Sequence, residues 1–108
     1  MTNKAPQYNL KDVKAAANTG NVNMSRTAER DALELGYDSA EVIRCLQSLS
    51  ANDFDQVKKY RHNKYFVPCD VYRLSYSHPS GKIDDLYIKF RYLANWITVM
   101  SFHLQRYG

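Results

Sequence analysis

Hydrophobic positions in the first half of the chain recur at helical spacing. Three helices are predicted, and each opens at an Asn, Ser, Thr or Asp that can cap its N-terminus. They run from Asn9 to Gly20, from Ser25 or Thr27 to Gly36, and from Asp38 to Leu49. Their inward-facing positions are Leu10, Val13, Ala17, Ala28, Ala32, Leu35, Val42, Ile43, Leu46 and Leu49. We therefore expect a layer of three helices in the N-terminal half.

A further capping pair follows the third helix. Ser50 and Asp53 have the spacing of a capping box, which predicts a short helix through Phe54 and Val57. The basic run at 58–62 comes next and is interpreted as the solvated end of that helix. The alternative is that this run, which lies just before the sheet, guides RNA.

The second half of the chain changes to a period of two. Residues 86–92 alternate strictly between apolar and polar, and residues 70–77 and 96–104 are rich in strand formers. Residues 65–67 are expected to add a short strand, and residues 78–81 suit a type I turn. Helices followed by strands predict an α+β fold, with the N-terminal helices packed against an antiparallel sheet.

Alternation along the strands assigns side chains to two faces of the sheet. The core face is expected to hold Leu86, Ile88, Phe90, Tyr72, Leu74, Tyr76, Trp96, Met100, Phe102 and Leu104. The open face is then expected to hold Arg73, Ser75, Tyr87, Lys89, Arg91, Ser101 and His103. One tyrosine, one imidazole and three cations would thus share a scaffold of strands.

Charge divides the chain in the same place as the hydrophobic pattern. Residues 58–108 carry nine basic and three acidic residues, a net charge of +6, whereas residues 1–57 carry six basic and eight acidic residues, a net charge of −2. All three histidines and seven of the nine tyrosines also lie in the second half. This asymmetry favours a nucleic-acid-binding surface. The alternative is that these side chains form the solvated face of a small sheet.

Length and composition set the remaining bounds. We expect residues 1–108 to form a single domain in the cytoplasm, because no run approaches the roughly 18 apolar residues of a membrane span and the first residues lack an apolar signal core. Cys45 and Cys69 show no CxxC spacing, and Cys45 is expected to be a buried thiol. The histidines and Cys69 also lack the spacing of metal ligands. We therefore predict no metal and no cofactor.

The residues of the open face suit metal-free cleavage of RNA. In that reaction a base takes the proton of the ribose 2′-OH, cations stabilise the charge on phosphorus, and an acid protonates the leaving oxygen. His103 can act as acid or base, Arg73, Lys89 and Arg91 can hold phosphate, and Tyr87 can stack on a base or donate to a phosphate oxygen. Each of these residues alone has a structural alternative, and it is their convergence on one face that favours a site. Asp70 is expected to be a structural hydrogen-bond acceptor.

Eight short motifs in register resemble the MqsR family of toxins. The first four are Leu10-Lys-Asp-Val-Lys14, Asn18-Thr-Gly-Asn-Val22, Arg26-Thr-Ala28 and Glu34-Leu-Gly-Tyr-Asp38. The others are Leu49-Ser-Ala-Asn-Asp-Phe54, Asp70-Val-Tyr-Arg73, Tyr87-Ile-Lys89 and Ser101-Phe102. No single motif is specific, but together they cover roughly residues 6–103.

This resemblance implies a fold and a function. The fold would be that of RelE-like toxins, with helices on one side of a curved antiparallel sheet. The function would be that of the toxin in a type II toxin–antitoxin pair, an mRNA interferase that needs no metal and no ribosome and cuts at GCU-like sites. The implied partners are mRNA and a cognate antitoxin protein, with no membrane involved.

The family's catalytic positions transfer unevenly to this chain. The strand tyrosine falls on Tyr87, and the lysine near the C-terminus falls on His103, a departure that related RelE-like toxins share. The family's other lysine and its glutamine fall on Gln56 and Cys69, so that Lys58 or Lys59 is expected to supply the missing charge.

The resulting site prediction has two parts. The predicted catalytic residues are Tyr87, His103, Lys58 and Lys59. The predicted RNA-binding residues are Arg73, Lys89, Arg91, Arg61, Gln56 and Cys69. Two rival functions remain open: a catalytically silent module that binds RNA or the ribosome, and a protein-interaction partner whose basic face meets an acidic protein.

Overall fold

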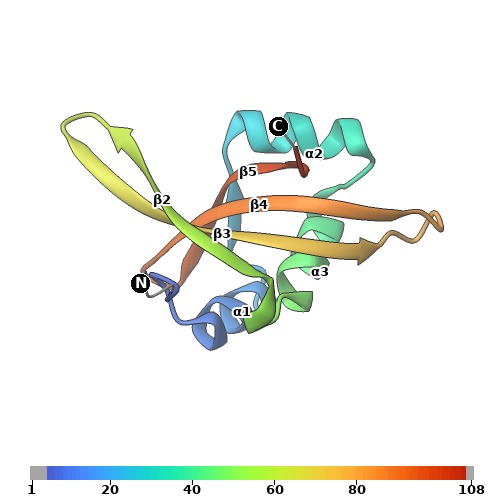
Figure 1. Ribbon diagram of the computed structural model, residues 1–108, viewed down its shortest axis with the longest axis horizontal. Coiled ribbons are helices and arrows are strands. Elements are labelled where there is room, and N and C mark those ends of the chain that lie inside the picture. Colours follow the sequence, from blue (N-terminus) through green and yellow to red (C-terminus); the bar gives the residue numbers. More distant parts are fainter. Residues whose placement is uncertain (1–4, 107–108) are drawn as a thin grey trace.

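The computed structural model describes residues 5–106 and shows three helices against one face of a curved five-stranded sheet (Figure 1). The helices are α1 (Leu10–Asn18), α2 (Arg26–Leu35) and α3 (Ser39–Ser48), followed by a single 3-10 turn, η1 (Ala51–Asp53). The strands are β1 (Val22–Met24), β2 (Phe54–His62), β3 (Tyr65–Ser77), β4 (Ile83–Leu93) and β5 (Trp96–Leu104). The predicted α+β fold is confirmed.

The helices begin where the capping residues predicted. The side chain of Asn9 accepts a hydrogen bond from the Lys11 amide at 2.9 Å. Ser25, rather than Thr27, caps α2, and Asp38 caps α3. These side chains satisfy backbone N–H groups that have no partner inside the helix.

The segment after α3 differs from the prediction. The short helix expected through Val57 is only the one turn of η1, and the basic run at 58–62 is part of β2 rather than a helix end. β2 pairs with β3 along its whole length and joins it through a tight turn, where Asn63 adopts a positive φ of 57°. Cross-strand pairing therefore overrides the local helix signal, and the short strand expected at 65–67 is the start of the 13-residue β3.

The strand order is β1-β5-β4-β3-β2, and all neighbours are antiparallel except β1 and β5. β1 pairs in parallel with β5, with Val22 opposite Ile97. A strand of three residues is too short for alternation to reveal, so the sequence did not predict this parallel pair.

The core lies between the helices and one face of the sheet. Leu86, Ile88, Phe90, Tyr72 and Leu74 are buried there as predicted. Cys45 is a free, buried thiol, also as predicted. Buried Asp70 accepts hydrogen bonds from the amides of Gln7 and Tyr8 at 2.8 and 3.0 Å, which confirms it as a structural acceptor.

The prediction for the faces of β5 was correct for Phe102 and Leu104, which lie opposite Ile88 and Leu86 of the core, but wrong for Trp96 and Met100. Leu104 is 43% exposed because it is the last residue of the strand. Trp96 is 45% exposed, Met100 is half-buried, and Ile97 and Val99 are buried instead. The reason is a β-bulge: Lys89 and Phe90 pair with Ser101 and Val99, so Met100 is an extra residue. The bulge shifts the alternation by one position, and it thereby keeps Ser101 and His103 on the open face.

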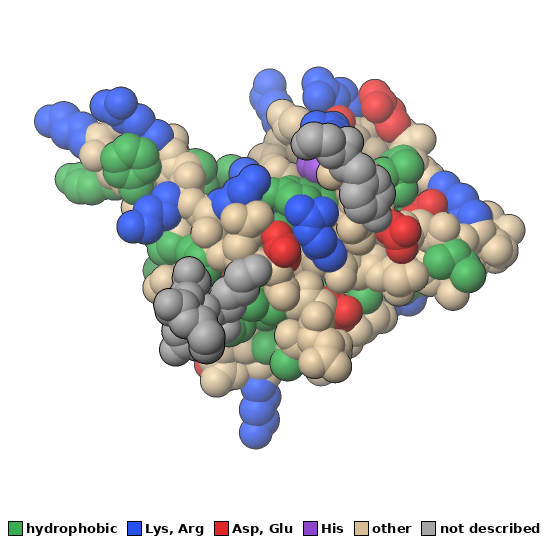
Figure 2. All heavy atoms as spheres, in the orientation of Figure 1, with side chains coloured by type: hydrophobic (Ala, Val, Ile, Leu, Met, Phe, Trp, Pro, Cys, Tyr) green, Lys and Arg blue, Asp and Glu red, His purple; other side chains and the backbone are tan. Residues whose placement is uncertain are grey.

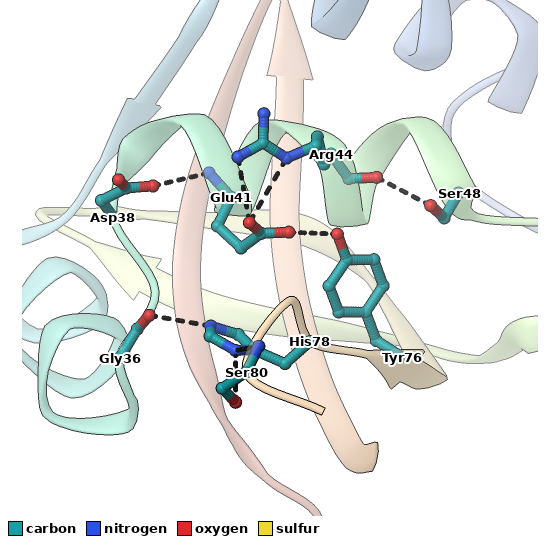
Figure 3. Close-up of polar contacts among 8 residues, drawn as sticks. All are labelled: Gly36, Asp38, Glu41, Arg44, Ser48, Tyr76, His78 and Ser80. Atoms are coloured by element: carbon teal, nitrogen blue, oxygen red, sulfur yellow. Dashed lines mark hydrogen bonds and ion pairs between the residues drawn. The ribbon is translucent and has the colours of Figure 1, made fainter. Parts of the chain in front are cut away.

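A polar cluster fastens α3 to the hairpin of β3 and β4 (Figure 3). The buried carboxylate of Glu41 accepts hydrogen bonds from Arg44, at 3.0 Å from Nη2, and from the Tyr76 hydroxyl. Because the Arg44 guanidinium and then the Tyr76 hydroxyl stabilise the charged carboxylate, the pKa of Glu41 lies below its ordinary value. His78 lies in the adjoining turn, with its Nε2 3.0 Å from the Gly36 carbonyl oxygen at the end of α2.

Among residues 5–106, no helix is long and apolar enough to cross a membrane.

Candidate active site

Three neighbouring strands bring the predicted site residues together on the face of the sheet that the helices leave open. Tyr87 on β4 pairs with Arg73 on β3 and with His103 on β5, and Lys89 pairs with Ser101. Directly paired residues of antiparallel strands project to the same side. The open face predicted from alternation therefore exists, with Tyr87 in its middle.

The rings of Tyr87 and His103 are stacked. Their centroids lie 4.7 Å apart and their planes differ by only 6°. His103 Nδ1 is 2.7 Å from the carbonyl oxygen of Leu104. A carbonyl can only accept a hydrogen bond, so Nδ1 carries the proton and Nε2 of the neutral ring keeps a lone pair. Nε2 is thus the atom of His103 that can exchange a proton with a substrate.

Cations surround the tyrosine ring. The Nζ atom of Lys58 lies 5.7 Å and the Cζ atom of Arg73 lies 5.4 Å from the ring centroid of Tyr87, within the range of cation–π attraction. A hollow of about 360 Å³ opens here, and it is lined by Lys58, Arg73, Tyr87, Lys89, Ser101, His103 and Arg106. None of these described lining residues is acidic, so the hollow suits an anion such as a phosphate.

The register of β2 separates the two candidate lysines. Lys58 pairs with Cys69 on the side of the hollow, whereas Lys59 pairs with Pro68 and projects to the other side. Arg61 also projects away from the hollow, and its Nε donates to the Asn63 carbonyl at 3.1 Å. The structure therefore brings Lys58 to the hollow and leaves Lys59 and Arg61 outside it.

The remaining predicted RNA-binding residues lie around the hollow rather than in it. Cys69 is fully buried, and burial raises its pKa to about 11 although Lys89 and Arg91 partly oppose the shift. As placed, the Cys69 thiol has no surface that RNA could touch. Gln56 is half-buried and donates to the Asp55 carboxylate at 2.9 Å. Arg91 is on the open face, two residues beyond Lys89 on β4 and opposite Thr98 on β5.

Sequence reasoning missed two residues at this site. Asp55 is an extra residue in a second bulge, between Phe54 and Gln56, and its carboxylate lies 3.4 Å from Arg73 Nε. Arg106 lies beyond β5, outside any predicted element, and lines the hollow. Nothing in the local pattern indicates the bulge, but an acidic residue just before a basic run was a signal that Asp55 could orient a cation.

The three histidines lie in different parts of the fold, on β2, in the turn after β3 and on β5. Within the described part of the chain, no three His, Cys, Asp or Glu side chains are grouped so that they could hold a metal ion.

Helices on one face of a curved sheet, with a basic hollow on the other, are consistent with the class of RelE-like toxins. The family model described as "Motility quorum-sensing regulator, toxin of MqsA" matches residues 5–104. The chain therefore belongs to the MqsR toxin family, which confirms the resemblance found in the sequence. Membership makes it the toxin of a toxin–antitoxin system and implies an antitoxin partner. No curated protein matches the chain.

Proposed function

We propose that this toxin is an endoribonuclease that cleaves mRNA without a metal ion and without the ribosome. The observation that carries the proposal is the stacked pair of Tyr87 and His103 inside a basic hollow, with His103 Nε2 available for proton transfer. The family resemblance supports cleavage at GCU-like sites in the cytoplasm, under the control of the antitoxin.

The proposed reaction makes and breaks one bond at phosphorus. A base removes the proton of a ribose 2′-OH, and the 2′ oxygen attacks the adjacent phosphate. The bond from phosphorus to the 5′ oxygen then breaks, and an acid protonates the leaving oxygen. The products are a 2′,3′-cyclic phosphate and a 5′-OH end.

Residues that line the hollow can supply both proton transfer and charge stabilisation in this reaction. His103 is the proton-transfer group, because imidazole both takes and gives protons near neutral pH. Lys58, Arg73 and Lys89 line the same hollow and would stabilise the charge that develops on the phosphate. Tyr87 lies between them and would orient the phosphate or a base.

Cleavage of an end-labelled RNA in EDTA tests the proposal. We expect the wild type to give a ladder that ends in 2′,3′-cyclic phosphate, and His103→Ala to cut about 100-fold more slowly, the usual scale for loss of an acid–base group. The thermal unfolding midpoint of the variant, measured in parallel, shows whether its fold is intact.

Other outcomes favour the rival functions. Intact RNA with a gel shift would indicate a silent binding module or a ribosome-dependent enzyme, and the assay would then be repeated on translating ribosomes. Absence of RNA affinity at physiological salt would indicate a protein-interaction surface. If His103→Ala cleaves RNA at the rate of the wild type, His103 takes no part in the mechanism.

A further inference from the structure

The end of the β2–β3 hairpin projects from the body of the molecule (Figure 1). This arm, residues 58–67, contains four Lys or Arg residues and no acidic residue. Figure 2 shows basic and hydrophobic side chains gathered over it. Tyr65 and Phe66 are 71% and 66% exposed, although aromatic rings of this size are usually packed against other residues. The arm is thus a cationic surface with unpacked aromatic faces.

One side of the arm continues the open face of the sheet. Tyr60 and His62 lie two and four residues after Lys58, which lines the hollow. Tyr60 pairs with Val67, and His62 pairs with Tyr65. Side chains two residues apart on a strand project to the same side. Tyr65 therefore shares the side of the hollow, and its neighbour Phe66 projects to the other side.

The open face continues from the hollow toward the end of the sheet where the arm projects. Beyond the pair of Lys89 and Ser101, the open face carries the pair Arg91–Thr98 and then the pair Leu93–Trp96. Because Phe90 lies opposite Asp70 and the strands are antiparallel, β4 runs beyond this pair in the direction in which β3 leads back to the arm. Both Leu93 and Trp96 are exposed. The strip, which we define as Arg91, Leu93, Trp96 and Thr98, therefore extends the open face from the hollow toward the end of the sheet where the arm projects.

We propose that this strip and the same side of the arm hold the single-stranded RNA that flanks the cleaved bond. Trp96 and Tyr65 would be stacking platforms for bases, and Arg91 would contact a phosphate between them and the hollow. Stacking on aromatic side chains between cations is how proteins hold single strands without reading their sequence. This inference rests on the proposed function, since it extends the path of the RNA that is cut in the hollow.

RNA fits this surface better than a protein does. On the side of the hollow the arm presents Lys58 and the strip adds Arg91, and both cations attract a polyanion. The strip also begins beside the basic hollow, where the proposed reaction would place the cleaved phosphate. A protein partner such as the antitoxin is therefore treated as an outcome of the test.

Tyr65→Ala and Phe66→Ala form a matched pair of variants, since both remove an exposed ring from adjacent positions on opposite sides of the arm. Each is tested on a long single-stranded RNA and on a short one that spans only the cleaved bond and its neighbours. We expect Tyr65→Ala to lower kcat/KM about tenfold on the long RNA, mainly through KM, because loss of one stacked base weakens binding on that scale. The short RNA should be cut as by the wild type, and Phe66→Ala should behave as the wild type on both. Trp96→Ala tests the strip separately and should resemble Tyr65→Ala.

The outcomes distinguish this inference from the proposed function. If both Tyr65→Ala and Trp96→Ala cut the long RNA as fast as the wild type does, the inference is overturned, whereas the proposed nuclease function stands. Equal losses for Tyr65→Ala and Phe66→Ala, or a loss of antitoxin affinity without any loss of RNA affinity, would also overturn it. If the wild type cuts neither RNA, the proposed function fails. The affinity of the protein for a long RNA with 2′-deoxy sugars then tests whether the arm binds a single strand. An affinity that Tyr65→Ala leaves unchanged would reject the proposed RNA path.

Discussion

At the scale of single residues, the site depends on which atoms remain available to a substrate. The Leu104 carbonyl fixes the proton of His103 on Nδ1, and stacking on Tyr87 fixes the plane of the ring. Asp55 contacts the Nε of Arg73, and a guanidinium has further N–H groups that can bind phosphate. Neighbouring groups of the protein thus hold the proposed catalytic side chains in place before any RNA binds.

The two adjacent lysines of β2 give a prediction at this scale. Lys58→Ala should lower RNA cleavage about tenfold or more, because it removes a cation from the hollow, and Lys59→Ala should have a clearly smaller effect, because its side chain projects to the other side. Initial cleavage rates of the two variants on one RNA make the comparison. A larger loss in Lys59→Ala would contradict the assignment of faces on β2.

At the scale of elements, the fold is held by contacts between helices and hairpins that lie far from the hollow. The Glu41 cluster joins α3 to the β3–β4 hairpin, and His78 joins the same hairpin to the end of α2 (Figure 3). These contacts position β4, which carries Tyr87 and Lys89 on its open side. The cluster therefore supports the site without touching it.

Glu41→Gln should lower the free energy of unfolding by about 1–3 kcal/mol at pH 7, since it removes a buried charge from its hydrogen bonds. The pKa of Glu41 is lowered in the folded protein, so its contribution is present above the ordinary value of 4.5 and is lost as pH falls through the lower folded value. The difference between variant and wild type should therefore shrink in acid.

Urea unfolding curves at several pH values measure this difference. Glu34→Gln, a change at an exposed glutamate of α2, is the control and should leave stability nearly unchanged. A difference between Glu41→Gln and the wild type that stays constant from pH 7 to acid would show that the charge of Glu41 does not contribute.

The elements also show which parts of the fold the sequence was sufficient to predict. Helix caps and the strict alternation of β4 are local signals, and the alternation correctly placed Tyr87 and Lys89 on the open face and Leu86, Ile88 and Phe90 in the core. β2 was misread because it is an outermost strand with polar side chains on both faces, which hides the period of two. The bulges at Met100 and Asp55 depend on pairing with distant strands, so no local pattern predicts them.

At the scale of the whole molecule, the two layers carry opposite charge. The half of the chain that forms the helices has a net charge of −2, and the half that forms most of the sheet has a net charge of +6. A polyanion would therefore be attracted to the sheet and repelled from the helices, which orients the molecule before contact.

RNA affinity should accordingly depend on salt through the cations of the open face. Arg73→Ala should weaken binding and reduce the slope of log affinity against log salt by about 1, because one phosphate contact is lost. Fluorescence anisotropy titrations from low to physiological salt give the slope. Arg30→Ala, which removes an exposed cation from α2, is the control, and an Arg73→Ala slope equal to that of the wild type would place Arg73 away from the RNA.

The position of β2 at the edge of the sheet has a consequence for self-association of the toxin. An outermost strand offers unpaired backbone groups on which a second copy of the chain could add its own strand and start an aggregate. Here that strand carries Lys58, Lys59 and Arg61, and two copies meeting edge to edge would bring these like charges together. The cations proposed to attract RNA would thus also keep one toxin molecule from polymerising with the next.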